Sequence, residues 1–107
     1  MTLRVVSIFG TRPEAVKMAP VVRALASEAQ VEAQVVVTAQ HRQMLDQVLG
    51  LFGITPDVDL DLMRPNQSLA QLTSEIITHL DPVLHKLKPD WILVQGDTTT
   101  VMAAALL

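Results

Sequence analysis

The stretch Val5-Val6-Ser7-Ile8-Phe9, followed by Gly10-Thr11-Arg12-Pro13-Glu14-Ala15-Val16-Lys17, decides the fold of this chain. Its first five residues are β-prone and almost wholly apolar, which is typical of a strand buried on both faces in a parallel sheet. A glycine and a turn then lead into a helical pattern, in which Thr11 and Glu14 have capping-box spacing and Pro13 presets the helical φ angle of the first turn. We therefore expect a strand, a tight turn and a helix in succession.

Two further short runs, Val35–Thr38 and Trp91–Gln95, share this apolar, β-rich character. Apolar residues at helical spacing occupy the intervals between the three runs. These positions are Met18, Val21, Val22, Leu25, Ala26 and Ala29, then Leu45, Val48, Leu49 and Phe52, then Leu69, Leu72, Ile76, Leu80, Val83 and Leu87. The alternation predicts an α/β fold with a doubly wound, mainly parallel sheet and right-handed crossovers.

Two segments of the sequence allow more than one structure. Pro82 interrupts the last helical pattern, so the segment is either two helices or one kinked helix.

The segment Asp57–Leu62 alternates acids with aliphatic residues, as the start of a calcium loop does. Such a loop also needs glycine at its sixth position and glutamate at its twelfth, where this chain has Leu62 and Ser68. The sequence therefore predicts a short, half-buried strand there instead of a calcium site.

The composition narrows the function classes. The chain has 107 residues, enough for one domain, and half of them are apolar, which is enough for a buried core. Eight basic and eleven acidic residues give a net charge of −3, which argues against a nucleic-acid-binding face.

The absence of cysteine excludes disulfides, thiolate metal sites and thiol nucleophiles. The longest apolar run, Val101–Leu107, is far shorter than the roughly 20 residues of a spanning helix, so we expect a cytoplasmic protein that binds no membrane.

Ligands of open α/β sheets bind beyond the carboxyl ends of the strands. Three segments of this chain are expected there: Gly10–Lys17, Ala39–Gln43 and Gly96–Thr100. In the first, unpaired amides at a helix start, the planar guanidinium of Arg12 and the ammonium of Lys17 suit an anion such as phosphate, although such cations are often only solvated. The dinucleotide fingerprint and the P-loop pattern do not occur, which disfavours nicotinamide cofactors and ATP hydrolysis.

Other polar residues allow two interpretations each. Asp97 follows the third strand-like run, Trp91–Gln95, and its carboxylate either caps the next helix or faces the ligand as a base. His41 either contacts a ligand or merely opens a helix, and we favour the helix start. We expect His79 and His85 at the surface, and Trp91 together with the methionines in the core.

Several stretches resemble the non-hydrolysing bacterial UDP-N-acetylglucosamine 2-epimerases. They are Gly10–Pro20, Thr38–Asp46, Phe52–Asp57, Lys88–Asp90 and Gln95–Thr100. The resemblance runs along the whole chain but reaches only the beginning of that family. It implies a two-domain clamshell of the GT-B type, in which residues 1–107 form an incomplete N-terminal Rossmann-like domain and the second domain is absent from this chain.

The resemblance also implies a reaction. That family interconverts UDP-N-acetylglucosamine and UDP-N-acetylmannosamine by eliminating UDP to a glycal and adding it back, with no metal or redox cofactor. Arg12 and Lys17 match positions that contact the nucleotide-sugar, and Asp97 matches a catalytic-site acid. Gln40 and Gln43 match positions that contact a second, allosteric UDP-N-acetylglucosamine, but an arginine of that site would fall near residues 66–67, where this chain has asparagine and glutamine.

The expected full-length enzyme is a cytoplasmic homodimer that feeds cell-surface polysaccharide synthesis and binds neither nucleic acid nor membrane. The family's remaining acids and histidine come after residue 107, so we expect no turnover by this chain alone. Two alternatives stay open: a glycosyltransferase of the same clamshell architecture, and a non-catalytic nucleotide-binding fragment. The sequence beyond Leu107 would distinguish them.

Overall fold

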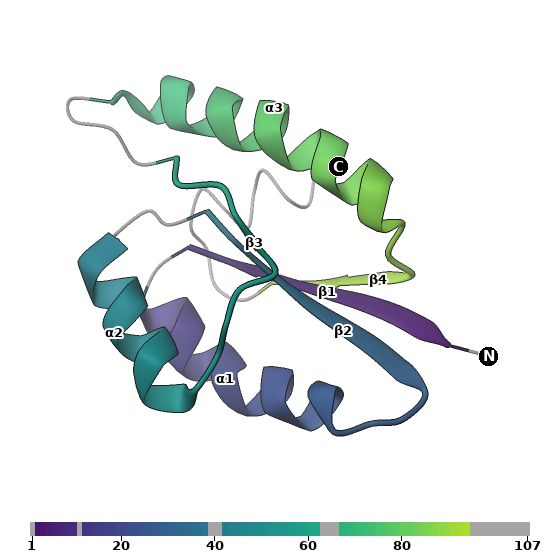
Figure 1. Cartoon of the computed structure of the whole chain (residues 1–107). Helices are drawn as coiled ribbons and strands as arrows, with labels where there is room; N and C mark the ends of the chain where they lie inside the picture. The colour runs from purple at the N-terminus through teal and green to yellow at the C-terminus, as the bar shows by residue number, and fades with distance from the viewer. Residues whose placement is uncertain (1, 11, 39–41, 63–66, 95–107) are drawn as a thin grey trace.

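The computed structural model describes residues 2–10, 12–38, 42–62 and 67–94, without the side chains of residues 12 and 42–45. Seven helices and strands make up this part of the chain (Figure 1). In order they are β1 (Leu3–Phe9), α1 (Arg12–Ala26), β2 (Val31–Val37), α2 (Arg42–Phe52), β3 (Val58–Asp59), α3 (Leu69–Leu87) and β4 (Trp91–Leu93).

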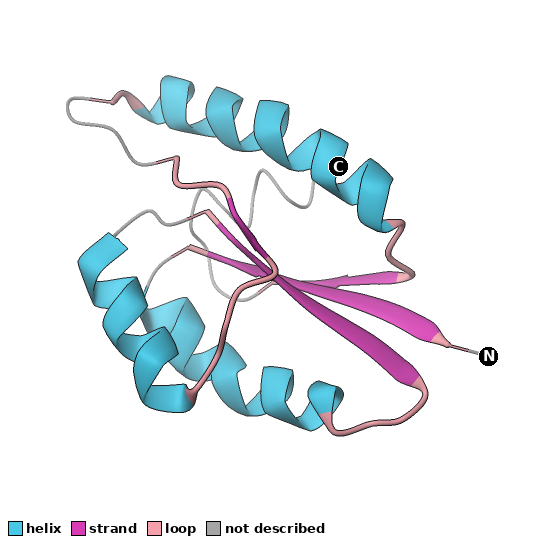
Figure 2. Cartoon of the chain, viewed as in Figure 1, coloured by secondary structure: helices cyan, strands magenta, loops and turns pink. Residues whose placement is uncertain are grey.

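The strands form one parallel sheet in the order β3-β2-β1-β4. Strands β1 and β2 pair along their whole length, from Leu3 opposite Val31 to Phe9 opposite Val37. Helices α1 and α2 lie on one face of the sheet and α3 on the other (Figure 2). The side changes because the right-handed crossovers first run outward from β1 to β3 and then return past β1 to β4. The predicted doubly wound, parallel α/β architecture is confirmed.

Each face of the sheet has its own apolar core. Successive residues of β1 point to opposite faces, so Val6 and Ile8 pack with α3 whereas Phe9 packs with α1 and α2. The buried residues of the first core are Val6, Ile8, Val36, Leu62, Leu72, Ile76, Leu80 and Leu84, and those of the second are Phe9, Ala15, Met18, Val22, Val35, Val37, Val48 and Leu49. The apolar character of β1 on both faces follows from this double burial.

Helix α3 is one helix that continues through Pro82, which decides between the two structures that the sequence allowed. It begins with a capping box, in which the Gln71 N–H donates to Ser68 Oγ at 3.0 Å and the Ser68 N–H donates to Gln71 Oε1 at 2.9 Å. Thr78 and Pro82 are both exposed. The Thr78 carbonyl, which loses its helical partner at the proline, is therefore on the solvent side, where water can replace that partner.

The sequence-based predictions for the core were wrong at five positions, namely Trp91, Leu69, which is 68% exposed at the first residue of α3, and Val21, Ala26 and Ala29 of the first helical pattern. Trp91 is 62% exposed, because it opens the edge strand β4 while α1 lies over β1 and β2. Val21 is 40% exposed, and Ala29 follows the end of α1. The buried stripe of α1 is Ala15, Met18, Ala19 and Val22. Val21 lies on the helix surface beside this stripe and faces solvent.

The segment after α2 has the predicted half-buried character. Strand β3 is short, but main-chain bonds to β2 continue beyond it, with the Leu60 N–H donating to Val37 O at 2.9 Å and the Leu62 N–H donating to Thr38 O at 3.0 Å. Leu62 is buried and Leu60 half-buried, while the alternating acids at 57, 59 and 61 are exposed. The aliphatic-inward, acid-outward strand is confirmed.

Both edge strands begin with the same device, a proline followed by an aspartate that holds its neighbour with two bonds. The Asp57 N–H donates to Val35 O at 2.8 Å while the Val35 N–H donates to Asp57 Oδ2 at 2.7 Å. Asp90 and Arg4 make the matching pair of bonds at 2.8 Å each. In a parallel ladder the acceptor for Val35 or Arg4 would be a main-chain carbonyl two residues before the aspartate. Each carboxylate takes that place, and we call the two arrangements the aspartate clamps.

Removing either clamp should destabilise the protein. We expect Asp57→Ala and Asp90→Ala each to lower the free energy of unfolding by about 1–2 kcal/mol, because a strand N–H then loses its charged acceptor. The loss should be larger for Asp57, whose bond is partly buried while that of Asp90 is exposed. Urea denaturation followed by circular dichroism measures it, with Glu28→Ala as the exposed control. Losses no greater than that of the control would show that the clamps do not hold the edge strands.

Candidate nucleotide-sugar site

The candidate site lies at the carboxyl edge of the sheet. Because all four strands are parallel, the segments that follow β1, β2 and β4 leave the sheet at this same edge. The crossovers change direction between β1 and β4, the position in an open α/β sheet where ligands enter. The described residues at this edge are Gly10, Arg12–Lys17, Thr38 and the first turn of α2.

The turn from β1 into α1 is closed by a buried carboxylate. The Gly10 N–H donates to Glu14 Oε1 at 3.0 Å, and Glu14 is only 2% exposed. Helix α1 begins at Arg12, so the predicted helix start is confirmed, and Pro13 lies in the first turn as predicted. The predicted partner of Glu14, Thr11, lies outside the described residues. The Gly10 N–H lies one residue before the N–H that Glu14 would accept in the predicted capping box.

Of the two cations predicted for this turn, the structure describes Lys17 with its side chain and Arg12 by its main chain alone. Lys17 lies one turn into α1 and is exposed, with no ion-pair partner among residues 2–10, 12–38, 42–62 and 67–94. The main chain of Arg12 forms the first residue of α1, while its side chain lies outside the described part. The positive end of the α1 helix dipole and the exposed ammonium of Lys17 one turn later make this end of the helix electropositive.

The second segment leaves β2 through a buried threonine. The Thr38 N–H donates to Phe9 O at 3.1 Å, and Thr38 is fully buried. This bond holds the end of β2 beside the end of β1, so the two helix starts open at neighbouring positions. Gln40 and His41 lie outside the described residues, and Gln43 belongs to the first turn of α2 with its side chain outside the description.

The third segment, Gly96–Thr100 with Asp97, lies wholly outside the described residues. Strand β4 runs parallel to β1, with Leu93 opposite Ser7. The expectation that Asp97 follows β4 at the carboxyl edge therefore stays a prediction.

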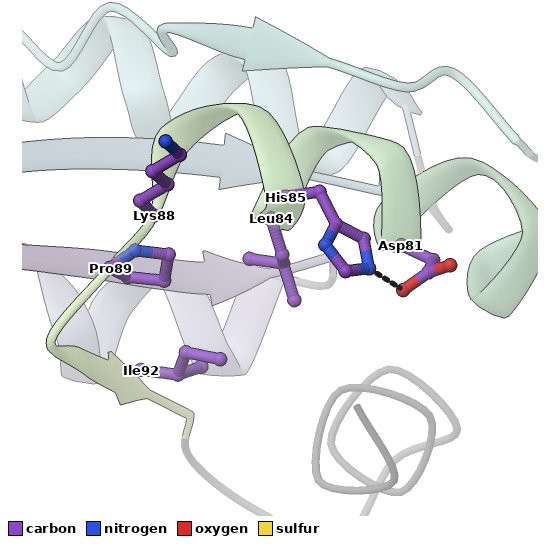
Figure 3. A pocket seen from close by; sticks show the side chains of 6 residues that line it. All are labelled: Asp81, Leu84, His85, Lys88, Pro89 and Ile92. Atoms are coloured by element: carbon purple, nitrogen blue, oxygen red, sulfur yellow. Dashed lines mark ion pairs between the residues drawn. The ribbon is translucent and has the colours of Figure 1, made fainter.

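A separate hollow of about 370 Å³ lies near the other edge of the sheet, at the end of α3 and the start of β4 (Figure 3). Its lining includes Leu84, Ile92 and the exposed ion pair of His85 Nε2 with Asp81 Oδ1, at 3.2 Å. His79 is likewise exposed, as predicted for both histidines. Of the residues expected at the carboxyl edge, none that the structure describes lines this hollow.

In the described part of the chain, no three histidine, cysteine or acidic side chains gather closely enough to hold a metal ion. No described helix has the length and apolarity needed to span a bilayer.

Sequence reasoning did not find the main contact of this site, the bond between Glu14 and Gly10. The spacing of Thr11 and Glu14 indicated a helix cap. It gave no sign that the carboxylate would be buried, since burial depends on how α1 packs against the sheet.

Comparison with known proteins gives a consistent result. The family model described as UDP-N-acetylglucosamine 2-epimerase matches residues 23–107. The UDP-N-acetylglucosamine 2-epimerase of Yersinia pestis is 60% identical over 104 residues, which cover 97% of this chain and 28% of that protein. This chain thus spans about 28% of the length of such relatives.

Solved structures agree with the sequence relatives. The UDP-GlcNAc 2-epimerase of Neisseria meningitidis bound to UDP-GlcNAc is 55% identical, with a TM-score of 0.90 over 97% of this chain and 28% of that one. The enzyme of Methanocaldococcus jannaschii in complex with UDP-GlcNAc and UDP is 31% identical, with a TM-score of 0.89 over 97% of this chain and 29% of that one.

Proposed function

This chain belongs to the UDP-N-acetylglucosamine 2-epimerase family, and we propose that it forms part of the nucleotide-sugar site of an enzyme that interconverts UDP-N-acetylglucosamine and UDP-N-acetylmannosamine. The observation that carries the proposal is the close match to the Neisseria meningitidis enzyme, which was solved with UDP-GlcNAc bound. The electropositive start of α1, at the carboxyl edge of a doubly wound sheet, supports it from physical principles.

The proposed reaction is an elimination followed by an addition. A base removes the proton from C2, the C1–O bond to UDP breaks with its electron pair going to the diphosphate, and a C1=C2 double bond forms. Adding UDP back to C1 and a proton to the other face of C2 gives the epimer. Negative charge grows on the departing diphosphate, so donors fixed beforehand at that position lower the barrier.

In this proposal the start of α1 receives the diphosphate. Main-chain N–H groups at the start of α1 and the positive end of the helix dipole attract the phosphate oxygens. Arg12 adds a planar pair of donors and Lys17 a compact charge. The exposure of Lys17 and its lack of an ion-pair partner in the described part of the chain support its availability for a ligand.

Asp97 is the proposed proton-handling or sugar-orienting acid of this segment. A location at the start of the helix that follows β4 would favour its ionised form, which suits a base better than an acid. Gln40 and Gln43 are proposed contacts of a second UDP-N-acetylglucosamine, and the asparagine and glutamine at residues 66–67, where an arginine of that site is expected, argue against its acting as an activator.

The remaining features of the proposal concern the whole enzyme. A second Rossmann-like domain closes on the first to complete the site, and the full-length protein is a cytoplasmic homodimer that feeds cell-surface polysaccharide synthesis. The resemblance of the motifs to the family supports these features.

A hybrid enzyme tests the proposed activity directly. In it, residues 1–107 of this chain replace the matching segment of the Yersinia pestis relative. We expect the hybrid to convert UDP-N-acetylglucosamine with a kcat within about tenfold of the parent, since tenfold corresponds to only about 1.4 kcal/mol of barrier. The 107-residue chain alone should give no detectable product. A folded hybrid without activity, or turnover by the chain alone, would contradict the proposal.

The role of Asp97 is tested by Asp97→Asn in the hybrid enzyme. We expect kcat to fall by about 100-fold or more, because the amide cannot accept the proton, while the thermal unfolding temperature stays unchanged. Asp81→Asn, at an exposed position of α3, serves as the control and should keep full activity. A near-normal kcat for Asp97→Asn would return Asp97 to a helix-capping role.

The role of Arg12 is tested by the affinity of the hybrid enzyme for UDP. Arg12→Ala should weaken binding by about tenfold or more, because a bidentate, charge-assisted contact is lost. Lys17→Ala should weaken it less, because an ammonium binds as a point charge. Calorimetric titration measures both, with Arg23→Ala in the last turn of α1 as the control. Equal affinities for Arg12→Ala and Arg23→Ala would place Arg12 among the solvated surface residues.

A further inference from the structure

Glu14 is a buried acid to which the proposed reaction assigns no chemistry. It is 2% exposed, and its Oε1 accepts the Gly10 N–H at 3.0 Å. Burying a carboxylate is unfavourable unless hydrogen bonds replace the lost water. A buried carboxylate beside an electropositive helix start therefore calls for an explanation beyond packing.

The main-chain geometry shows where this bond lies. The Phe9 carbonyl accepts the Thr38 N–H at 3.1 Å, so it points toward β2. No described peptide bond is cis, and in a trans peptide the carbonyl and the next N–H point in opposite directions. The Gly10 N–H therefore points toward β4. Glu14 meets it on the β4 side of β1, next to the position where the crossovers change direction.

The bond also spans the turn that carries the proposed phosphate contacts. Its two ends, Gly10 and Glu14, lie on either side of Arg12 in the sequence. Gly10 is the first residue after β1, and Glu14 lies in the first turn of α1. The bond thus fixes the direction in which the helix leaves the strand, and with it the placement of the first amides, Arg12 and Lys17.

We propose that Glu14 is a positioning residue, which holds the Gly10–Lys17 turn in the geometry that receives the diphosphate of a nucleotide-sugar. This inference rests on the proposed function. The ligand is an anion, so the negative charge of Glu14 opposes binding, whereas the reach of its side chain to Gly10 supports it. The length of the side chain, rather than its charge, is therefore the property that the site needs.

Two substitutions in the hybrid enzyme separate reach from charge. Glu14→Gln keeps the length and an oxygen that can accept the Gly10 N–H, whereas Glu14→Asp keeps the charge but is shorter by one methylene. We expect Glu14→Gln to rescue the affinity for UDP to within about threefold of the parent, and Glu14→Asp to weaken it by about tenfold or more, with a parallel loss of kcat, because displaced contacts cost this much. If Glu14→Asp does not fold, Glu14→Met, which keeps the length without an acceptor, takes its place.

The control is Val22→Ala, which destabilises α1 from a buried position away from the turn. An effect on UDP affinity for Glu14→Asp no larger than that of Val22→Ala would overturn the inference, because a merely structural role predicts that result. A loss of UDP affinity for Glu14→Gln together with near-normal affinity for Glu14→Asp would overturn it in favour of charge, and equal losses for the two would overturn it because length alone would then not explain the effect. If the unsubstituted hybrid binds no UDP and forms no product, the proposed function fails and this inference fails with it. If the unsubstituted hybrid is active and Glu14→Asp binds normally, only this inference fails.

Discussion

Strand β1 is enclosed on all four sides, by β2 and β4 along its edges and by helices over both faces. A strand in this position must satisfy its main-chain groups through its neighbours and present apolar side chains to both faces. The connections from it must also run outward in both directions. With right-handed crossovers, that requirement puts α1 and α2 on one face and α3 on the other. The two cores and the shared carboxyl edge both follow from the burial of this one strand.

The same enclosure explains why a carboxylate is buried at the site. The chain leaves β1 while it is still inside the core, so the Gly10 amide needs a partner that water cannot supply. Strand β4 ends at Leu93, opposite Ser7, and within the described residues its ladder does not extend to Gly10. Helix α1 supplies the acceptor instead, through Glu14. A local departure from ordinary packing rules at the end of a strand is typical of a functional edge.

The local pattern of apolar residues predicted the central strands of this fold well. It predicted poorly which residues at the edge of the sheet are covered by a helix. Apolar runs on both faces were enough to identify β1 and β2, since only a sheet covered on two sides requires them. Trp91 belongs to a similar run, but periodicity does not tell whether a helix covers the residue, and at this edge α1 does not reach it. Pro82 was ambiguous for a related reason, because a proline is tolerated where the helix faces water.

The candidate site was predictable to a smaller extent. The position of the β1–α1 turn followed from the strand-turn-helix pattern, and the structure confirms it. The roles of Arg12, Lys17 and Asp97 came from resemblance, because spacing alone cannot separate a ligand contact from a solvated charge or a helix cap. The bond from Glu14 to Gly10 could not be predicted, since it depends on how α1 packs against the sheet.

The aspartate clamps have a consequence for how proteins of this architecture diverge. Both clamps, at Asp57 and Asp90, grip the sheet where its edge strands begin, at the end away from the proposed ligand. A one-residue slip of a strand would turn its apolar side chains to the wrong face, and the clamps oppose such a slip before the chain reaches the opposite edge. Insertions and substitutions beyond the carboxyl ends can therefore accumulate without misaligning the sheet. Substrate preference and the architecture of the scaffold can then evolve along largely separate routes.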